Sequence, residues 1–172
     1  MSERVSKPLT PGYAVRPATV VDAERLGWVH VEAWREAYPG IVAQKALDAL
    51  DPAARADRWR EWLRHPQNPM HLRLGIDPTD QIVGMIAAGP SRDEDSPTDW
   101  ELRAINVLRV AQGTGLADAL VADAVGDRPA HLWVLEENPR ALAFYRRIGF
   151  APDDGRKYDE SLAAWELRLV RR

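Results

Sequence analysis

The sequence predicts a single domain of the α/β class, with one mixed β-sheet and helices on both of its faces. Segments whose apolar residues recur at helical spacing are interspersed with segments in which apolar and polar residues alternate one by one. Their order along the chain is strand, helices, three strands, helix, strand, helix and two strands. This order differs from the regular alternation of strand and helix in a doubly wound fold, so a mixed sheet is expected.

The length and composition are those of one globular domain. A chain of 172 residues with 45% hydrophobic and 28% charged residues can bury its own core. We expect residues 1–12 to form a flexible tail and residues 13–172 to form the domain. The tail lacks the apolar core of a secretory signal, and the longest apolar run, residues 82–88, is too short to span a bilayer. The expected location is therefore cytoplasmic, with no membrane partner.

Charge and cysteine content exclude several classes of function. The 26 acidic and 23 basic residues give a net charge of -3 without a long basic block, so no nucleic-acid partner is expected. The absence of cysteine excludes disulfides, a thiol nucleophile and thiolate metal ligands. The four histidines are not spaced as metal ligands, and no Gly-x-Ser-x-Gly turn is present, so neither a metal site nor that type of serine nucleophile is expected.

Local signals place the elements of the first part of the chain. Thr19 and Asp22 have the spacing of a capping box at the start of a helix, and Pro39-Gly40 ends that helix. Asp51-Pro52 combines an N-cap with a proline at the first helical position. The expected elements are a strand at residues 13–16, a helix from Thr19 to Pro39, and helices at residues 42–50 and 52–64.

From residue 71 the apolar residues alternate, as in strands. Residues 71–76 and 81–88, separated by Asp-Pro-Thr-Asp, predict an antiparallel hairpin. A strand, a helix and a strand at residues 100–107, 115–125 and 131–135 predict a right-handed parallel βαβ unit. The remaining expected elements are a helix from Asn138-Pro139 to about Gly149, and strands at residues 150–152 and 162–170.

A glycine-rich turn joins the strand at residues 100–107 to the next helix. Such a turn presents backbone N–H groups at the positive end of a helix, which suits a pyrophosphate, although a tight connection alone would also explain it. The turn lacks the Lys-Ser/Thr pair of a P-loop. It also lacks the third glycine and the later acidic residue of a dinucleotide fingerprint, which argues against nucleotide hydrolysis and hydride transfer.

Two motifs carry a resemblance to a known family. The sequence Gln-Gly-Thr-Gly-Leu-Ala at residues 112–117 resembles the Gln/Arg-x-x-Gly-x-Gly/Ala signature of the GNAT superfamily of N-acetyltransferases. The Asn, Ala, Phe-Tyr and Gly-Phe of residues 138–150 are similar to a second motif of the same family. Residues 30–40 are similar to the first helix and loop of many bacterial members. The resemblance covers residues 13–170, and the expected order of elements is that of the family fold.

The resemblance implies a fold, a donor and a reaction. The fold is a central, mostly antiparallel sheet in which one parallel pair splays apart at the cofactor site. The donor substrate is acetyl-CoA or a related short acyl-CoA, and an acceptor amine attacks it directly in a ternary complex. The donor-binding residues implied are Val107, Leu108 and Arg109 for the pantetheine arm, Gln112, Gly113, Thr114, Gly115, Leu116 and Ala117 for the pyrophosphate, and Asn138, Ala141 and Tyr145 beside the pantetheine and thioester.

The turn departs from the family pattern at two positions. Thr114 stands where many members carry Lys or Arg, so the turn has less positive charge for the phosphates. Arg109 stands where proline is common. These departures concern the affinity for the donor rather than the type of donor.

The reaction needs a base, because an ammonium has no lone pair to attack the thioester. Asp99, Glu101 and Arg103 alternate along a predicted strand and therefore share one face. Members of the family commonly carry Glu at this distance from the turn, so Glu101 is the first candidate for the general base and Asp99 is the second. The alternative is that Arg103 and Glu101 are only solvated polar neighbours on a half-exposed strand.

Tyr145 is the candidate general acid for the departing thiolate. A thiol has a pKa of about 8.5 and a phenol about 10, so a hydrogen bond to the thiolate describes the role better than full proton transfer. Its alternative role is packing of the helix onto the sheet, and Asn138 has the alternative role of an N-cap. Trp34 and Tyr38 are candidates for the wall of the acceptor pocket.

Two other functions remain open on the sequence alone. A non-catalytic acyl-CoA-binding sensor would keep the fold but would not need Glu101 or Tyr145. A nucleotide-binding domain of another α/β family would need the missing fingerprint. A final strand that could be exposed and seven tryptophans, most of them expected in the core, also favour a homodimer.

Overall fold

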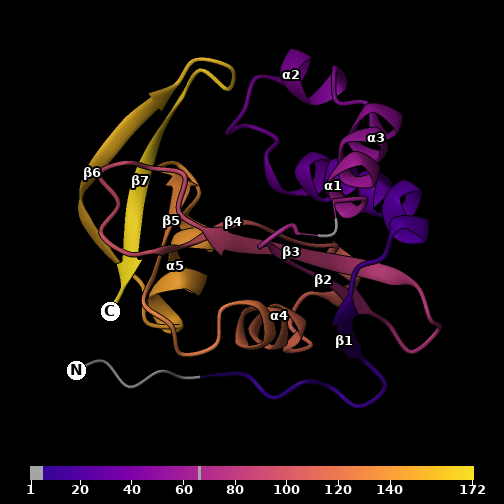
Figure 1. The fold of residues 1–172 in the computed structure, drawn as a ribbon. Helices are drawn as coiled ribbons and strands as arrows, with labels where there is room; N and C mark the ends of the chain where they lie inside the picture. The colour runs from indigo at the N-terminus through magenta and orange to yellow at the C-terminus, as the bar shows by residue number, and fades with distance from the viewer. Residues whose placement is uncertain (1–5, 66) are drawn as a thin grey trace.

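The computed structural model describes residues 6–65 and 67–172, and it shows one mixed β-sheet with helices on both faces (Figure 1). Two short 3-10 helices, η1 and η2, accompany the predicted elements. The elements in chain order are β1 (Ala14–Pro17), η1 (Val20–Asp22), α1 (Ala23–Ala37), α2 (Gln44–Asp48), α3 (Pro52–Leu63), β2 (His71–Ile76), β3 (Ile82–Pro90), β4 (Trp100–Val107), η2 (Arg109–Ala111), α4 (Leu116–Ala124), β5 (Ala130–Leu135), α5 (Pro139–Arg147), β6 (Ala151–Asp159) and β7 (Ala164–Arg171).

The sheet confirms the predicted mixture of antiparallel and parallel strands. Its seven strands lie in the order β1-β2-β3-β4-β5-β7-β6. Neighbours are antiparallel except β4 and β5, which are parallel and are connected through α4. The βαβ unit expected from residues 100–135 is therefore present.

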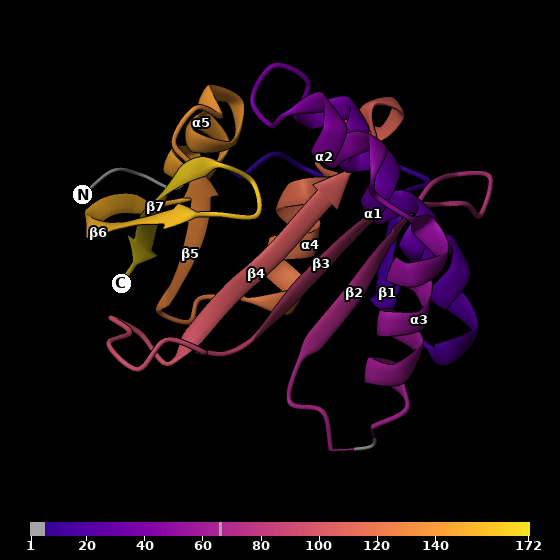
Figure 2. The ribbon, with the colours of Figure 1, turned by 90° about the horizontal axis from the view of Figure 1, so that it is seen from above.

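The parallel strands β4 and β5 pair only near their N-terminal ends. Their ladder consists of Glu101 opposite His131. Figure 2 shows the two strands moving apart toward their C-terminal ends, with β4 and β5 pointing in clearly different directions. This divergence separates the end of β4 from β5, as the family resemblance implies.

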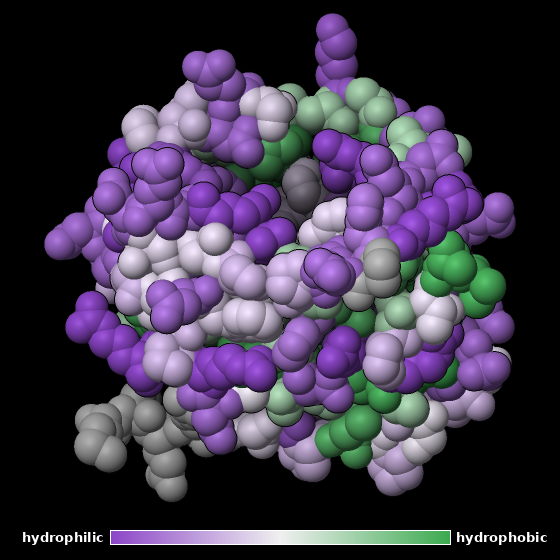
Figure 3. Space-filling model, viewed as in Figure 1, coloured by the Kyte–Doolittle hydropathy of each residue, from purple (hydrophilic) through white to green (hydrophobic). Residues whose placement is uncertain are grey.

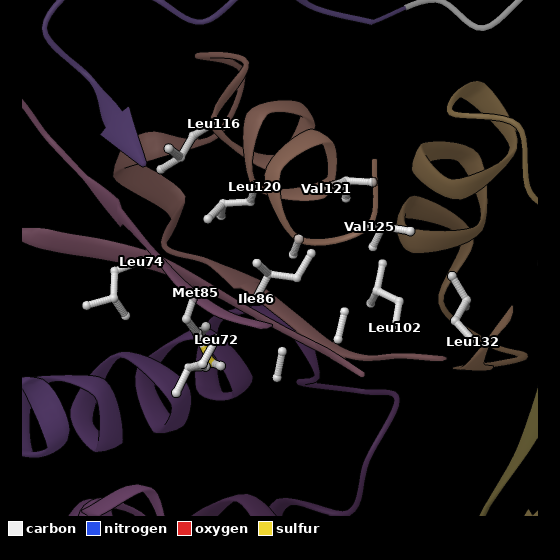
Figure 4. Packing of buried hydrophobic residues seen from close by; sticks show 14 of the residues in the cluster. Leu72, Leu74, Met85, Ile86, Leu102, Leu116, Leu120, Val121, Val125 and Leu132 are labelled. Atoms are coloured by element: carbon white, nitrogen blue, oxygen red, sulfur yellow. The ribbon is translucent and has the colours of Figure 1, made fainter. Parts of the chain in front are cut away.

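The helices form two layers around the sheet. Helices α1, α2 and α3 cover one face, and α4 and α5 lie on the opposite face (Figure 1). Leu116, Leu120 and Val121 of α4 belong to the main core cluster, together with Ile86 and Leu102 of the sheet (Figure 4). Burial of each such side chain contributes about 1.5–3 kcal/mol to folding, which fixes α4 and the turn before it against the sheet.

Residues 6–12 lie against the start of α4. The N–H of Lys7 donates to Asp118 Oδ1 at 2.9 Å, and the N–H of Thr10 donates to the Thr114 carbonyl at 2.8 Å. A Cβ at Gly115, whose φ is +81°, would lie 2.2 Å from the carbonyl oxygen of Pro8, so this position requires glycine. The sequence predicts a flexible tail over residues 1–12, whereas its described part is held by these contacts. Residues 1–5 lie outside the described residues.

The last strand pair differs from the sequence expectation. Strand β6 extends to Asp159, although the sequence predicts a strand only at residues 150–152. The segment from Asp153 to Gly155 has low β-propensity, but Arg168 of β7 donates to Asp153 at 2.9 Å across the irregular register. Pairing with β7 therefore extends the strand where local preference does not. Helix α2 also differs from the expectation, because it spans Gln44–Asp48 and is shorter than the expected helix at residues 42–50.

The tryptophans correct a second expectation. None of the seven falls among the fully buried residues, and Trp28 and Trp165 are 38% and 44% exposed. The Arg25 guanidinium lies 4.0 Å from the centre of the Trp28 ring, and the Arg156 guanidinium lies 3.8 Å from the centre of the Trp165 ring. Arginine stacking makes an exposed indole favourable, which composition alone does not reveal.

In the described part of the chain, no helix combines the length and the apolar character that a membrane crossing requires.

Candidate active site

A cavity of about 810 Å³ opens where β4 and β5 diverge. Its lining comes from α1 on one face of the sheet and from the glycine turn, α4 and α5 on the other. The cavity therefore joins the two faces through the gap in the sheet. Figure 3 shows the molecular surface hollowed between the β6–β7 hairpin and the segment containing α1 and α2.

The glycine turn forms one end of the cavity. Gln112, Gly113, Gly115, Leu116 and Ala117 all contribute to the lining. Both glycines have φ of +81°, a left-handed conformation that other residues rarely adopt. The turn ends at the N-terminus of α4, so unpaired N–H groups and the helix dipole favour an anion at this position.

Leu108, Arg109 and Thr114 do not line the cavity. The N–H of Leu108 donates to the Val83 carbonyl at 2.9 Å, and the N–H of Arg109 donates to Glu36 Oε2 at 2.6 Å. These two backbone donors are engaged and are not available to a pantetheine arm. The hydroxyl of Thr114 donates to the Ala111 carbonyl at 2.6 Å, so it closes the turn. Val107, in contrast, does line the cavity.

Cationic side chains supply the charge that Thr114 does not. Lys7, Arg140 and Arg147 all line the cavity at this end. The ammonium of Lys7 lies 3.7 Å from the position that a Cβ on Gly113 would occupy, so it lies directly beside the turn. The pKa of Asp118, which holds Lys7 and Arg147 in place, lies below its usual range. Burial alone would raise this pKa, but the hydrogen bonds from the Arg147 guanidinium and from the Lys7 N–H lower it.

Helix α5 places Asn138, Ala141 and Tyr145 along the cavity wall. Asn138 is the N-cap, because its Oδ1 accepts a hydrogen bond from the Ala141 N–H at 3.0 Å, and it lines the cavity as well. Tyr145 is only 8% exposed, and its ring lies edge-on to Phe144 and Phe150. Burial, and then the nearby Tyr38, raise the pKa of Tyr145 above that of a free phenol. The phenol is therefore protonated at neutral pH and can donate a hydrogen bond.

Aromatic side chains of α1 form the other end of the cavity. His30, Trp34 and Tyr38 are four residues apart, so they share one helix face, and all three line the cavity. The Trp34 and Tyr38 ring centres are 4.8 Å apart, edge to face. Trp34 and Tyr38 therefore line the cavity, and their predicted role as a wall of the acceptor pocket stays a prediction.

Glu166 of β7 is one of the carboxylates at this end, and it lies near Tyr38. It lines the cavity, and its side chain is mostly buried at 16% exposure. Burial raises the pKa of Glu166, while Lys157, whose Nζ lies 3.5 Å from Glu166 Oε2, opposes the rise. Burial, and then the charge of Glu166, also raise the pKa of Tyr38. A carboxylate with a raised pKa beside an aromatic pocket is suited to accept a proton.

The two carboxylates favoured by the sequence do not line the cavity. Glu101 is 2% exposed and accepts hydrogen bonds from Arg92 at 3.0 Å (Nε) and 2.5 Å (Nη2). Burial alone would raise the pKa of Glu101, but the ion pair with Arg92 lowers it below the usual value. The Glu101 carboxylate is therefore a weaker base than a free glutamate. Asp99 is exposed at the start of the strand. Glu101 stands at the end of β4 that is paired with β5 rather than at the end that diverges, and Asp99 lies just before β4 begins at Trp100.

Sequence reasoning missed the other polar residues of the cavity, which include Lys7, His30, Arg55 and Glu166. His30 had a signal, because it precedes Trp34 and Tyr38 at helical spacing. The others come from the tail, from a different helix and from the last strand, and no local pattern connects them. Among residues 6–65 and 67–172, no three His, Asp or Glu side chains are grouped as metal ligands.

Comparison with known proteins relates most of the chain to one family. The model of the acetyltransferase (GNAT) family matches residues 28–150. An uncharacterized N-acetyltransferase of Bacillus subtilis, YuaI, is 29% identical over 162 residues, which cover 91% of this chain and 89% of that protein.

Solved structures show the same fold. The PaiA N-acetyltransferase of Thermoplasma acidophilum, in complex with coenzyme A, has a TM-score of 0.73 at 16% identity, over 91% of this chain and 97% of that one. A histone acetyltransferase HPA2 and related acetyltransferase of Corynebacterium glutamicum has a TM-score of 0.67 at 22% identity, over 92% and 95% of the two chains.

Proposed function

Because the chain belongs to the acetyltransferase (GNAT) family, it is an acetyl-CoA-dependent N-acetyltransferase, and we propose that the cavity between β4 and β5 is its active site. The observation that carries this proposal is the continuity of the cavity through the sheet. Its glycine turn, on one face, suits the pyrophosphate of the donor, and its aromatic end, on the other, suits an acceptor. The thioester would lie in the gap between them.

In the proposed reaction the amine nitrogen attacks the thioester carbonyl carbon, and the carbon–sulfur bond then breaks. Glu166 receives the proton that the amine loses, and the Tyr145 hydroxyl donates a hydrogen bond to the departing thiolate. The raised pKa values of both groups support these roles. A non-catalytic binding module would leave a proton acceptor and a phenol at the same cavity without a use, so catalysis is favoured.

The proposal is tested by thiol release from acetyl-CoA across a panel of amines, run beside calorimetric titration with acetyl-CoA. We expect donor binding and acceptor-dependent thiol release. If acetyl-CoA does not bind, the cavity is not the donor site. Binding without turnover of any amine would instead favour a sensor.

Lys7 is expected to contribute to donor affinity through the phosphates. Removal of this charge in Lys7→Gln should weaken acetyl-CoA binding about 5- to 10-fold. Hydrogen bonds to charged groups typically contribute about 1.5–3 kcal/mol, and solvent and salt partly screen the proposed bond between the Lys7 ammonium and a phosphate. The loss should shrink as salt rises, and it should be absent for S-acetylpantetheine, which lacks the phosphates. Dissociation constants for both thioesters at two ionic strengths check this, with Lys45→Gln on the exposed surface of α2 as the matched control. An equal loss for both thioesters would contradict the phosphate contact.

Two further proposals concern the protein as a whole. We propose a homodimer, supported by the edge strand β6 and by the exposed aromatic pair Tyr158 and Trp165, whose ring centres are 5.3 Å apart. We also propose a cytoplasmic location, supported by the lack of cysteine. Sedimentation velocity of the purified protein tests the first, and cell fractionation tests the second.

A further inference from the structure

An arginine with no ion-pair partner in the described part of the chain stands at the acceptor end of the cavity. Arg55 of α3 is half-buried and lines the 810 Å³ cavity. It also lines an adjoining cavity of about 400 Å³ next to α2, and the two cavities share Trp34, Asp159 and Leu162 as walls. Among the described residues, its guanidinium makes no side-chain hydrogen bond or ion pair, and burial lowers its pKa from the usual value.

The other arginines at this end are already neutralised. Arg92 is held by both oxygens of Glu101. Arg103 lies 3.6 Å from the same carboxylate and donates to the Pro90 carbonyl at 2.6 Å. Withdrawing a cation from water without a close counter-charge is costly, so an anion that enters the cavity would stabilise the half-buried Arg55.

His30 provides a second, independent observation at the same place. Its side chain lines the cavity and is 6% exposed, and neither ring nitrogen has a hydrogen-bond partner among the described residues. Burial, and then the charges of Arg55 and Arg58, lower the pKa of His30 to about 4, so the ring is neutral at physiological pH. A buried neutral imidazole with unmet hydrogen bonds beside a guanidinium without an ion-pair partner is the arrangement expected of an anion site.

We propose that Arg55 and His30 form an anion subsite, and that the acceptor is an amine that also carries a carboxylate. This inference rests on the proposed function, because it assigns the acceptor of the same cavity. The carboxylate would accept hydrogen bonds from the Arg55 guanidinium and an N–H of His30. The amine would then lie at the opposite end, beside Tyr38 and Glu166.

The length of α1 sets the expected distance between the two ends of this acceptor. His30 and Tyr38 are eight residues apart on one face, which corresponds to about 12 Å along the helix axis. An extended chain spans roughly 3.3–3.6 Å per residue, so about three residues would bridge the two ends. The inferred class is therefore a short peptide, or another amino acid derivative of similar length, acetylated on its amine.

The test uses glycine, diglycine, triglycine and tetraglycine, each paired with its C-terminal amide, which lacks the negative charge. Binding to the CoA-loaded protein is measured by calorimetry, and kcat/KM is measured with acetyl-CoA. We expect the carboxylate to be preferred over the amide about 10-fold or more, with the largest preference near triglycine. Arg55→Gln should abolish most of this preference, and Arg55→Lys should restore part of it.

The matched control is Arg64→Gln, which removes an exposed arginine that is the C-cap of the same helix and does not line the cavity. It should keep the preference for the carboxylate. Equal binding of each acid and its amide by the wild-type protein would overturn the inference, and so would an equal loss in Arg64→Gln and Arg55→Gln. Carboxylate preference without acetylation of any amine would support the subsite while refuting the proposed function, so the two failures are distinguishable.

Discussion

The Tyr145→Phe variant is expected to lower kcat about 100-fold while leaving the affinity for acetyl-CoA unchanged. The phenol lies in the cavity wall, and its raised pKa keeps it protonated throughout the neutral range. Its hydrogen bond gains strength as negative charge develops on the sulfur, so its loss affects the transition state more than donor binding. A 100-fold loss corresponds to about 2.7 kcal/mol of transition-state stabilisation.

Single-turnover rates and donor dissociation constants separate these two effects. Phenylalanine keeps the ring contacts with Phe144 and Phe150, so the thermal stability of the variant should remain close to that of the wild type. Tyr158→Phe, on the exposed surface of β6, is the matched control and should keep full activity. Weaker donor binding with an unchanged rate would show instead that the tyrosine shapes the donor site.

Local signals were sufficient to predict most of the fold. The N-caps Asp51 and Asn138, each followed by proline, mark helix starts that the structure confirms by hydrogen bonds. The apolar patterns before residue 107 predicted β2, β3 and β4, because their apolar residues face a core on at least one side, and β3 is buried along nearly its whole length. Strand β6 was underestimated, since it depends on pairing with β7 rather than on its own composition.

The donor end of the site was more predictable than the acceptor end. The glycine turn and α5 are continuous segments, so their motifs carry their positions in the fold. The polar groups of the acceptor end come from α1, α3 and β7, which only tertiary structure brings together. Glu101 shows the limit of pattern reasoning, because its strand face was predicted while the ion pair with Arg92 was not.

Glu166 is proposed as the proton acceptor, so Glu166→Gln is expected to lower kcat/KM at neutral pH about 100-fold or more. Glutamine has nearly the same shape but cannot accept a proton. The wild-type pH profile should rise as Glu166 loses its proton, at a pH above that typical of a free glutamate because burial raises its pKa. A peptide amine loses its proton near a pKa of about 7.7–8.0, so the rise in kcat/KM that it causes lies at higher pH. Only the rise at lower pH, the acid limb caused by Glu166, should vanish in Glu166→Gln.

Lys157 provides an independent test of this assignment, because its positive charge lowers the pKa of Glu166. In Lys157→Gln that influence is lost, so the pKa of the base rises and the acid limb of kcat/KM should move to higher pH without disappearing. Glu101→Gln is the comparison for the other carboxylate. It should lower the stability of the fold by about 1–3 kcal/mol through the loss of a buried ion pair, while the acid limb stays in place. If Glu101→Gln removes the limb and Glu166→Gln does not, the base is the carboxylate on β4, reached through a chain of water molecules rather than by direct contact with the cavity.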